Sequence, residues 1–453
     1  MKNSVKNKIW LIAIPLLMAC SGFLEERPNK GILIPTTEAD IRALLDNDSE
    51  LNLVPGFGLL SSDDLVITDG GWASLRTEEE QNAYLWREEI WPTTGAADWS
   101  RIYRVIFIAN VVLDQIEKLP ETQELTKMRA EALFHRAHAH FMLAQLFSPA
   151  YFQGLNDQEP GIPLRLNSEI LERSPRVSLQ SYYSQVLHDL DQAFISLPLL
   201  DPIKTRPSQL AVKALLARIY LTIGNYEMAE EAADWVINRQ EVSLISYANL
   251  NPNAAYPFEK YNDEVIFHTV LISAGFSGVS NIQVWVNPEL MEKYREGDLR
   301  KTLYTQLRPN GGYTFKGQYS GNFSRFGGLA LDEIQLIKAE CLARRNQTGE
   351  ALGLMNQFLE TRYLADQYEP KDENNSMEIL KWIVEEKRKS LVYRGLNWID
   401  LRRLNAEPEF QRVLTREING ETVILNPLSK KYVLPIPENE LALNPIPQTD
   451  RRD

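Results

Sequence analysis

The sequence lacks any apolar run long enough to cross a membrane. The run at Ile9–Ala19 has 11 residues and contains Pro15, whereas a membrane-spanning helix needs roughly 20 apolar residues. Three lysines precede this run, and Leu-Met-Ala-Cys at residues 17–20 closes it. An export signal typically begins with basic residues, continues with a short apolar run, and has a small residue just before the cleavage site. We therefore expect residues 1–19 to be a cleaved signal peptide.

Cysteine is almost absent, with only Cys20 and Cys341 in 453 residues. The sequence Leu-x-Ala-Cys resembles the lipobox of bacterial lipoproteins, in which the cysteine becomes the lipidated first residue. A lipidated Cys20 excludes an intramolecular disulfide, so packing must stabilise the fold. Several acyl chains on Cys20 would hold the protein to a membrane without any membrane-facing surface. An ordinary secreted protein is the alternative.

Histidine is scarce, with 5 residues, and acidic residues outnumber basic ones. The chain has 48 Lys and Arg against 61 Asp and Glu, and its net charge is −13. No basic run provides a phosphate-binding surface, which argues against nucleic acid and anionic lipid as partners. Glu131, His135 and His138 share one helix face, but a further ligand and a His-Glu-x-x-His pattern are missing. We expect them to pack with Glu to His hydrogen bonds, and we predict no metal and no cofactor.

Apolar residues recur at helical spacing over much of the chain and predict paired helices. The pairs are 99–119 with 122–147, 179–197 with 208–221, 331–344 with 350–362, and 377–392 with 398–404, and a further helix ends at 237. Small residues within 214–233 resemble a tetratricopeptide repeat. We predict a mostly α fold: a right-handed superhelix of tetratricopeptide-like hairpins with a loop-rich, partly β region packed against it. The repeats alone also fit a generic all-α bundle.

Two stretches break the helical pattern. Residues 54–98 are rich in Gly, Asp and Trp, and residues 246–328 mix Gly, Pro, Asn and aromatics with β-like runs at 265–272 and 282–286. Long aromatic loops on a rigid frame are where binding groups usually sit. Helical repeats at about 99–240 and 329–405 therefore frame two expected ligand-binding parts.

Both loop regions carry the side chains that sugar recognition needs. Flat aromatic faces cover the C–H surface of a sugar ring, and carboxylates or guanidinium groups bond its hydroxyls. Each tryptophan is more often core than platform, so the set is a stronger prediction than its members. A peptide is the rival ligand, since the same loops can bind extended backbone. The candidates are Asp63, Asp64, Asp69, Trp72, Arg76, Trp86 and Trp91 in the first region, and Trp285, Tyr313 and Arg325 in the second.

The segment EKRKSLVYRGLNWIDLRRLN at 386–405 resembles the signature of the SusD/RagB family of surface nutrient-binding lipoproteins of Bacteroidetes. The usual form is close to ERRRELAFEGHRWFDLRR, and Ser390, Arg394 and Asn397 depart from its acid, acid and arginine. These departures bear on local salt bridges. The tail at 432–448, the helix pair at 99–147 and the start CSGFLEERP resemble the family too, so the resemblance covers nearly the whole mature chain.

The resemblance implies a single SusD-like domain over 20–453 and non-catalytic capture of a nutrient, above all an oligosaccharide. It also implies delivery to a SusC-like TonB-dependent transporter. Glu25 and Glu26 look like the acidic signal that sends such lipoproteins to the outer face of the outer membrane. Within the signature, Asp400 is expected to form an ion pair with Arg402 or Arg403. The alternatives are a peptide-binding RagB-like lid, a repeat scaffold that binds another protein, and a helical glycoside hydrolase.

Overall fold

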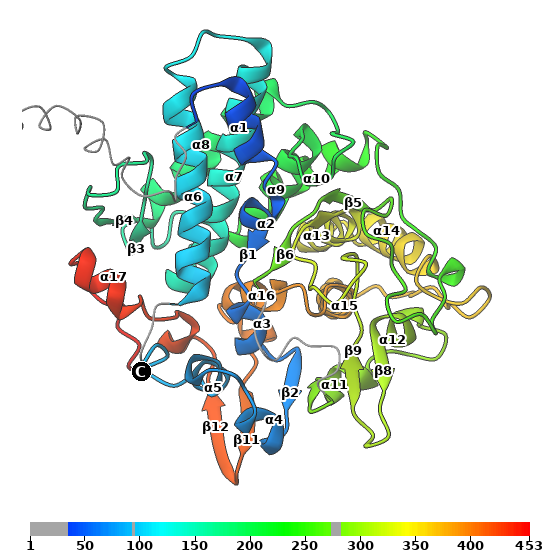
Figure 1. Cartoon of the computed structure of the whole chain (residues 1–453). Helices are drawn as coiled ribbons and strands as arrows, with labels where there is room; N and C mark the ends of the chain where they lie inside the picture. The colour runs from blue at the N-terminus through cyan, green and yellow to red at the C-terminus, as the bar shows by residue number, and fades with distance from the viewer. Residues whose placement is uncertain (1–34, 93–95, 273–281) are drawn as a thin grey trace, which may run out of the picture.

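The structure is a computed structural model that describes residues 35–92, 96–272 and 282–453 (Figure 1). The predicted signal peptide and Cys20 lie outside the described residues. Within those residues, no helix combines the length and apolarity that a bilayer span requires. The division of the chain into a signal peptide and a single domain therefore stays a prediction.

Long helices form the frame and pack against their neighbours in the chain. α7 is buried along most of its length, and its buried polar side chains include Glu131 and Arg136, both of which form ion pairs. The side chain of Thr122 begins α7 by accepting the backbone N–H of Leu125, and the helix ends at Phe147 before Pro149. The first three long helices, which pack side by side, are α6 (Ala97–Ile116), α7 (Gln123–Phe147) and α8 (Leu179–Ser196).

The stack continues in the second half of the chain. α10 packs on α9 and α13, and α13 packs on α14 and α15. Ala217 and Ala233 are fully buried, as the close approach of α9 and α10 requires, and Gly224 turns between them with φ +81°. The predicted mostly α fold of stacked hairpins is confirmed. Its members are α9 (Gln209–Thr222), α10 (Tyr226–Ile237), α13 (Leu331–Arg344), α14 (Thr348–Glu360), α15 (Ser376–Ser390) and α16 (Leu396–Leu404).

Short strands pair in twos across the described residues. Both predicted β-like runs contain strands, and these strands pair with segments far away in the sequence. The parallel pair is β1 (Leu53–Val54) with β6 (Val270–Leu271). The antiparallel pairs are β2 (Leu65–Ile67) with β7 (Val284–Val286), β3 (Pro160–Pro163) with β4 (Arg176–Ser178), β5 (Val265–Phe267) with β10 (Leu329–Ala330), β8 (Thr305–Leu307) with β9 (Tyr313–Phe315), and β11 (Leu414–Ile418) with β12 (Glu421–Leu425).

The β11–β12 hairpin was not predicted, although the sequence carries its signal. Asn419 and Gly420 form the turn with φ of +51° and +78°, as a two-residue hairpin turn of this hand requires. The hairpin tip lies beside α4 in Figure 1. The short helices are α1 (Glu38–Leu45), α2 (Asp48–Leu51), α3 (Phe57–Ser61), α4 (Asp69–Ala73), α5 (Glu78–Tyr84), α11 (Pro288–Glu292), α12 (Leu299–Tyr304) and α17 (Glu438–Leu443).

Residues of the α15–α16 segment form a buried ionic network. Arg403 donates to both oxygens of Glu340 at 2.7 Å and to Asp400 at 2.7 Å. Arg402 points elsewhere and donates to the carbonyls of Gln145 and Ser148 at the carboxyl end of α7. Of the two ion pairs that the sequence allowed for Asp400, the structure therefore forms the one with Arg403. This segment joins the two halves of the helical frame.

Candidate functional site

Asp63 and Asp64 are held by cations and an amide, and only Asp63 is partly exposed, with 18% of its side chain accessible. Arg388 and Arg412 lie 3.0 and 2.9 Å from the carboxylate of Asp63, and Asn397 donates to both acids at 2.7 Å. Asp64 is fully buried, and burial raises its pKa to about 6. The two carboxylates thus join the start of β2 to the α15–α16 segment.

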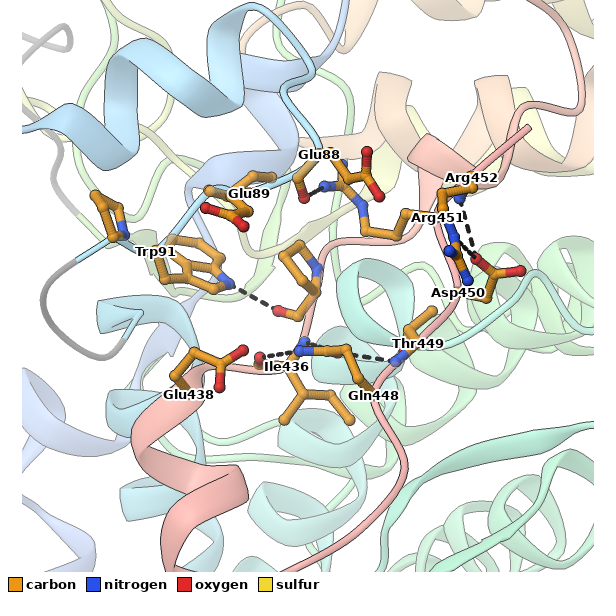
Figure 2. Close-up of a pocket in the computed structure, with 13 residues that line it drawn as sticks. Glu88, Glu89, Trp91, Ile436, Glu438, Gln448, Thr449, Asp450, Arg451 and Arg452 are labelled. Atoms are coloured by element: carbon orange, nitrogen blue, oxygen red, sulfur yellow. Dashed lines mark hydrogen bonds and ion pairs between the residues drawn. The ribbon is translucent and has the colours of Figure 1, made fainter.

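Trp86 and Trp91 are core side chains. Trp86 is 2% exposed, its indole N–H donates to the carbonyl of Ser61 at 2.9 Å, and the guanidinium of Arg416 lies 4.2 Å from its ring centre. Trp91 is 6% exposed, and its N–H donates to the carbonyl of Pro435 at 2.7 Å (Figure 2). Since both polar groups are bonded and both rings are covered, neither side chain offers a free aromatic platform.

The carboxyl-terminal tail borders a pocket of about 500 Å³ beside Trp91 (Figure 2). The side-chain amide of Gln448 exchanges hydrogen bonds with the backbone of Ile436 at 2.9 and 2.8 Å. Arg451 is buried and donates to the carbonyl of Val433 at 2.7 Å. The acids at this pocket are Glu88, Glu89, Glu438 and Asp450.

Arg325 is buried as well. Its guanidinium lies 4.8 Å from the ring centre of Phe315 and 5.6 Å from that of Tyr393. Burial lowers its pKa to about 10. A cation enclosed by aromatic rings at 5% exposure belongs to the interior, so Arg325 does not form part of an open ligand surface.

The remaining predicted ligand-binding residues are at least partly exposed; they are Asp69, Trp72, Arg76, Trp285 and Tyr313. Strand pairing brings the two loop regions that contain them together. β2 pairs with β7 so that Val66 lies opposite Trp285. The hydroxyl of Thr68 donates to the side chain of Gln283 at 2.9 Å, just before α4. β7 in turn contacts β9. We call the region formed by α4, β2, β7 and β9 the strand lobe.

Trp285 and Tyr313 are the partly exposed aromatic residues on the second side of the strand lobe. A side chain at Gly312 would come within 2.3 Å of the Trp285 ring, so the ring lies directly against the backbone that leads into Tyr313. The indole N–H of Trp285 donates to the carbonyl of Ile282 at 2.8 Å. This bond and the glycine contact fix the ring while leaving part of it open.

α4 brings Trp72 to the strand lobe. The Thr68 side chain begins the helix by accepting the N–H of Gly71. The indole N–H of Trp72 donates to the carbonyl of Gln81, whose side-chain amide donates back to Trp72, both at 3.2 Å. Asp69 is exposed and accepts the backbone N–H of Asn419 at 2.9 Å. Arg76 is also exposed and lies two residues beyond Ser74, the C-cap of α4.

A groove of about 670 Å³ adjoins Tyr313, between residues 252–255, α12 and the β8–β9 hairpin. Lys301 and Lys316 also line it, and neither was singled out from the sequence. No local pattern marks these lysines, because tertiary packing places α12 beside the loop at 252–255.

The histidine face of α7 is an interior contact. Both oxygens of Glu131 accept bonds from Arg42, at 2.8 and 2.9 Å. Neither ring nitrogen of His135 has a hydrogen-bond partner among the described residues, so the expected bond from Glu131 to His135 is not formed. His135 and His138 pack near Phe267. Among the described residues, no three His, Cys, Asp or Glu side chains are grouped to hold a metal ion.

Two family models match most of the chain. Residues 23–221 match a family described as "Starch-binding associating with outer membrane", and residues 331–450 match the one described as "SusD family". This chain belongs to the SusD/RagB family. Two SusD-like proteins of Formosa agariphila, P38 and P2, are 22% and 23% identical to it, and each alignment covers 97% of this chain and 98% of the relative.

Solved structures of the family share the fold. A SusD superfamily protein of Bacteroides thetaiotaomicron aligns with a TM-score of 0.73 at 21% identity, over 92% of this chain and 100% of that one. A putative sugar binding protein of Bacteroides vulgatus aligns with a TM-score of 0.74 at 19% identity, over 92% and 99%. The SusD-like arrangement of stacked hairpins is therefore shown for this chain.

The departures from the SusD/RagB signature have local partners. Arg394 stands where the family has an acid, and it donates to both oxygens of Asp332 at 3.0 and 2.6 Å. Ser390 accepts a bond from Arg300 at 2.8 Å. Asn397 stands where the family has an arginine and bonds Asp63 and Asp64 as described above. The signature thus forms a bonded interior in this chain despite three substitutions.

Proposed function

We propose that this protein is a non-catalytic, lipid-anchored protein of the outer membrane that captures an oligosaccharide and delivers it to a SusC-like TonB-dependent transporter. The observation that carries the proposal is that α4, β7 and β9 of the strand lobe each carry a partly exposed aromatic residue, Trp72, Trp285 and Tyr313 respectively. Partly exposed, bonded aromatic rings offer apolar area at little cost in conformational entropy, as a saccharide platform requires.

Hydrogen-bonding groups lie close to these rings. Asp69 and Arg76 are exposed beside Trp72, so a carboxylate and a guanidinium are available to sugar hydroxyls. The family descriptions support the same ligand class, since one of them names starch binding and a protein of the same fold is described as a "putative sugar binding protein". The lipid anchor rests on the Leu-Met-Ala-Cys sequence that ends at Cys20.

The placement of the candidate acids Asp63 and Asp64 supports a binding protein over a hydrolase that would use this pair. A glycosidase needs two carboxylates on opposite sides of an open site, about 5 to 10 Å apart. The adjacent acids Asp63 and Asp64 are instead held by Arg388 and Asn397 in the interior. They stabilise the fold and leave no room for a glycosidic bond.

Affinity capture of the full-length lipoprotein from solubilised outer membrane, followed by mass spectrometry, tests the transporter part of the proposal. We expect a TonB-dependent barrel in stoichiometric amount. The matched control is Cys20→Ser, which should leave the membrane fraction because the lipid attachment atom is lost. Reproducible absence of a barrel would contradict delivery to a transporter, and capture of a different polypeptide would favour a repeat scaffold.

A further inference from the structure

The groove beside Tyr313 differs in charge from the rest of the protein. The chain is acidic overall, with a net charge of −13. Yet Lys301 and Lys316 line the groove, and none of its lining residues in the described part of the chain is an acid. The pocket beside Trp91 shows the opposite pattern, with four acids in its lining. A local excess of positive charge in an acidic protein favours an anionic ligand at that place.

Lys316 is buried without a counter-charge. It is 5% exposed, and its ammonium donates to the carbonyl of Pro252 at 2.7 Å. Across the described residues it has no carboxylate within ion-pair distance, and burial lowers its pKa. An ammonium carries three donors, and a buried cation without an anion is unfavourable. An anion that enters the groove would supply the missing charge.

Lys301 adds a second ammonium on the wall of the same groove. It is partly exposed and lies 5.5 Å from the ring centre of Tyr313, which holds the cation beside the opening. Asn253 and Gln306 are exposed at the rim and offer amide donors and acceptors. Cations, amides and an aromatic wall together match a charged sugar better than a neutral one.

We infer that this groove is a subsite for an anionic sugar residue, a uronate or a sulfated sugar, whose carboxylate or sulfate is bound by Lys301 and Lys316 against the wall formed by Tyr313. The inference rests on the proposed capture of an oligosaccharide and narrows its ligand class. Each ammonium forms a charge-assisted hydrogen bond with the anion, and such bonds are about twice as strong as neutral ones. The volume of about 670 Å³ accommodates a sugar residue with its substituent.

The test is binding of the full chain to an immobilised panel of uronate-containing, sulfated and neutral oligosaccharides, with titration calorimetry on the strongest binder. We expect the strongest signals from acidic chains, and the split between uronate and sulfate identifies the anion. Lys301→Gln should weaken that binding about tenfold, since it removes one charge-assisted bond. Binding should also fall as salt approaches about 1 M, where the Debye length is ~3 Å.

Two further variants separate binding from folding. Lys381→Gln removes an exposed lysine that pairs with Glu378 on α15, so it matches the charge change and should leave affinity unchanged. Lys316→Gln should lower affinity at least as much as Lys301→Gln. If Lys316→Gln also lowers thermal stability, because the loop at 252–255 unfolds, then the affinity of Lys301→Gln alone tests the anionic subsite.

The outcomes distinguish this inference from the function on which it rests. Preference for neutral chains, or acidic-chain binding that Lys301→Gln leaves intact, would overturn the anionic subsite while oligosaccharide capture stands. Binding to no saccharide in the panel would overturn both.

Discussion

Two regions of the molecule differ in how their charged side chains are paired. These regions are the helical core around α13 and α15, and the strand lobe with its groove. In the core, Arg403 is 4% exposed and donates to both oxygens of Glu340 on α13 at 2.7 Å. Beside the strand lobe, Lys301 and Lys316 line an open groove without an acid among its described lining residues. Charge that is neutralised internally stabilises the fold, whereas charge left without a partner is available to a ligand.

The same contrast separates the tryptophans. Trp86 is enclosed by Arg416 and the backbone, while Trp285 lies on β7 with part of its ring open. The residues of the family signature accordingly stabilise the fold. The residues that we propose to contact the ligand lie outside this signature. Substitutions in the two regions should therefore affect different measurements.

The largest expected effect is on the ionic network. Glu340 is fully buried and accepts from Arg403 at 2.7 Å, Arg344 at 3.0 Å and Lys387 at 3.5 Å. Glu340→Gln leaves these three cations with only two acids, Asp400 and Glu407, and so leaves one buried positive charge uncompensated. It should therefore lower the free energy of unfolding by roughly 3–5 kcal/mol in a denaturant titration.

The control for Glu340→Gln is Glu385→Gln. This acid pairs with Lys293 at the surface, where both side chains are about 40% exposed, so the loss should stay below about 1 kcal/mol. Equal effects of the two substitutions would contradict the distinction between core charge and surface charge.

The second effect is on core aromatic packing. Trp86→Ala should lower the free energy of unfolding by about 3 kcal/mol or more, because it removes a buried ring and its hydrogen bond to Ser61. Thermal and denaturant unfolding both report this loss. A ring that served the ligand instead would give a stable variant with impaired binding, which would contradict our assignment of Trp86 to the core.

The third effect depends on pH. Asp98 is fully buried, accepts the N–H of Phe57 at 2.7 Å, and burial raises its pKa to about 7 from an ordinary value of 3.8. The folded state therefore holds the proton more tightly than the unfolded state. This contribution to stability is complete below pH ~4 and is lost as pH rises to about 7, by up to about 1.4 kcal/mol per pH unit.

Asp98→Asn isolates that contribution, because asparagine keeps an oxygen acceptor but does not ionise. The free energy of unfolding of this variant should fall less than that of the wild type between about pH 4 and 7. Parallel pH profiles for the two proteins would show that the pKa of Asp98 is not raised in the folded state, which would contradict this account.

Much of the fold could be predicted because its signals are local. α13 spans the predicted residues 331–344, and α7 ends at Phe147 because Pro149 cannot continue it. The β-like runs were also found from their apolar residues. The hairpin at Asn419-Gly420 was missed because a short exposed alternation offers little apolar contrast, although its turn residues were visible.

The candidate site was harder to predict because burial depends on distant partners. Trp86 is covered by Arg416, which is more than 300 residues away in the sequence. No sequence pattern near Trp86 predicts this contact. Trp285 is placed by pairing with β2, which lies in the other loop region. The ammonium of Lys316 is positioned by its hydrogen bond to the carbonyl of Pro252. Sequence reasoning therefore found the loop regions but not which side chains remain open.

The most direct measurement compares saccharide affinity and folding stability in the double variant Trp285→Ala/Tyr313→Ala. Our account predicts that affinity for the best-binding oligosaccharide falls at least about tenfold, which corresponds to ~1.4 kcal/mol. The free energy of unfolding should fall by about 2–3 kcal/mol, less than the loss of two core rings would cost, because both rings are partly exposed. Unchanged affinity in a folded double variant would contradict the claim that the strand lobe binds the ligand.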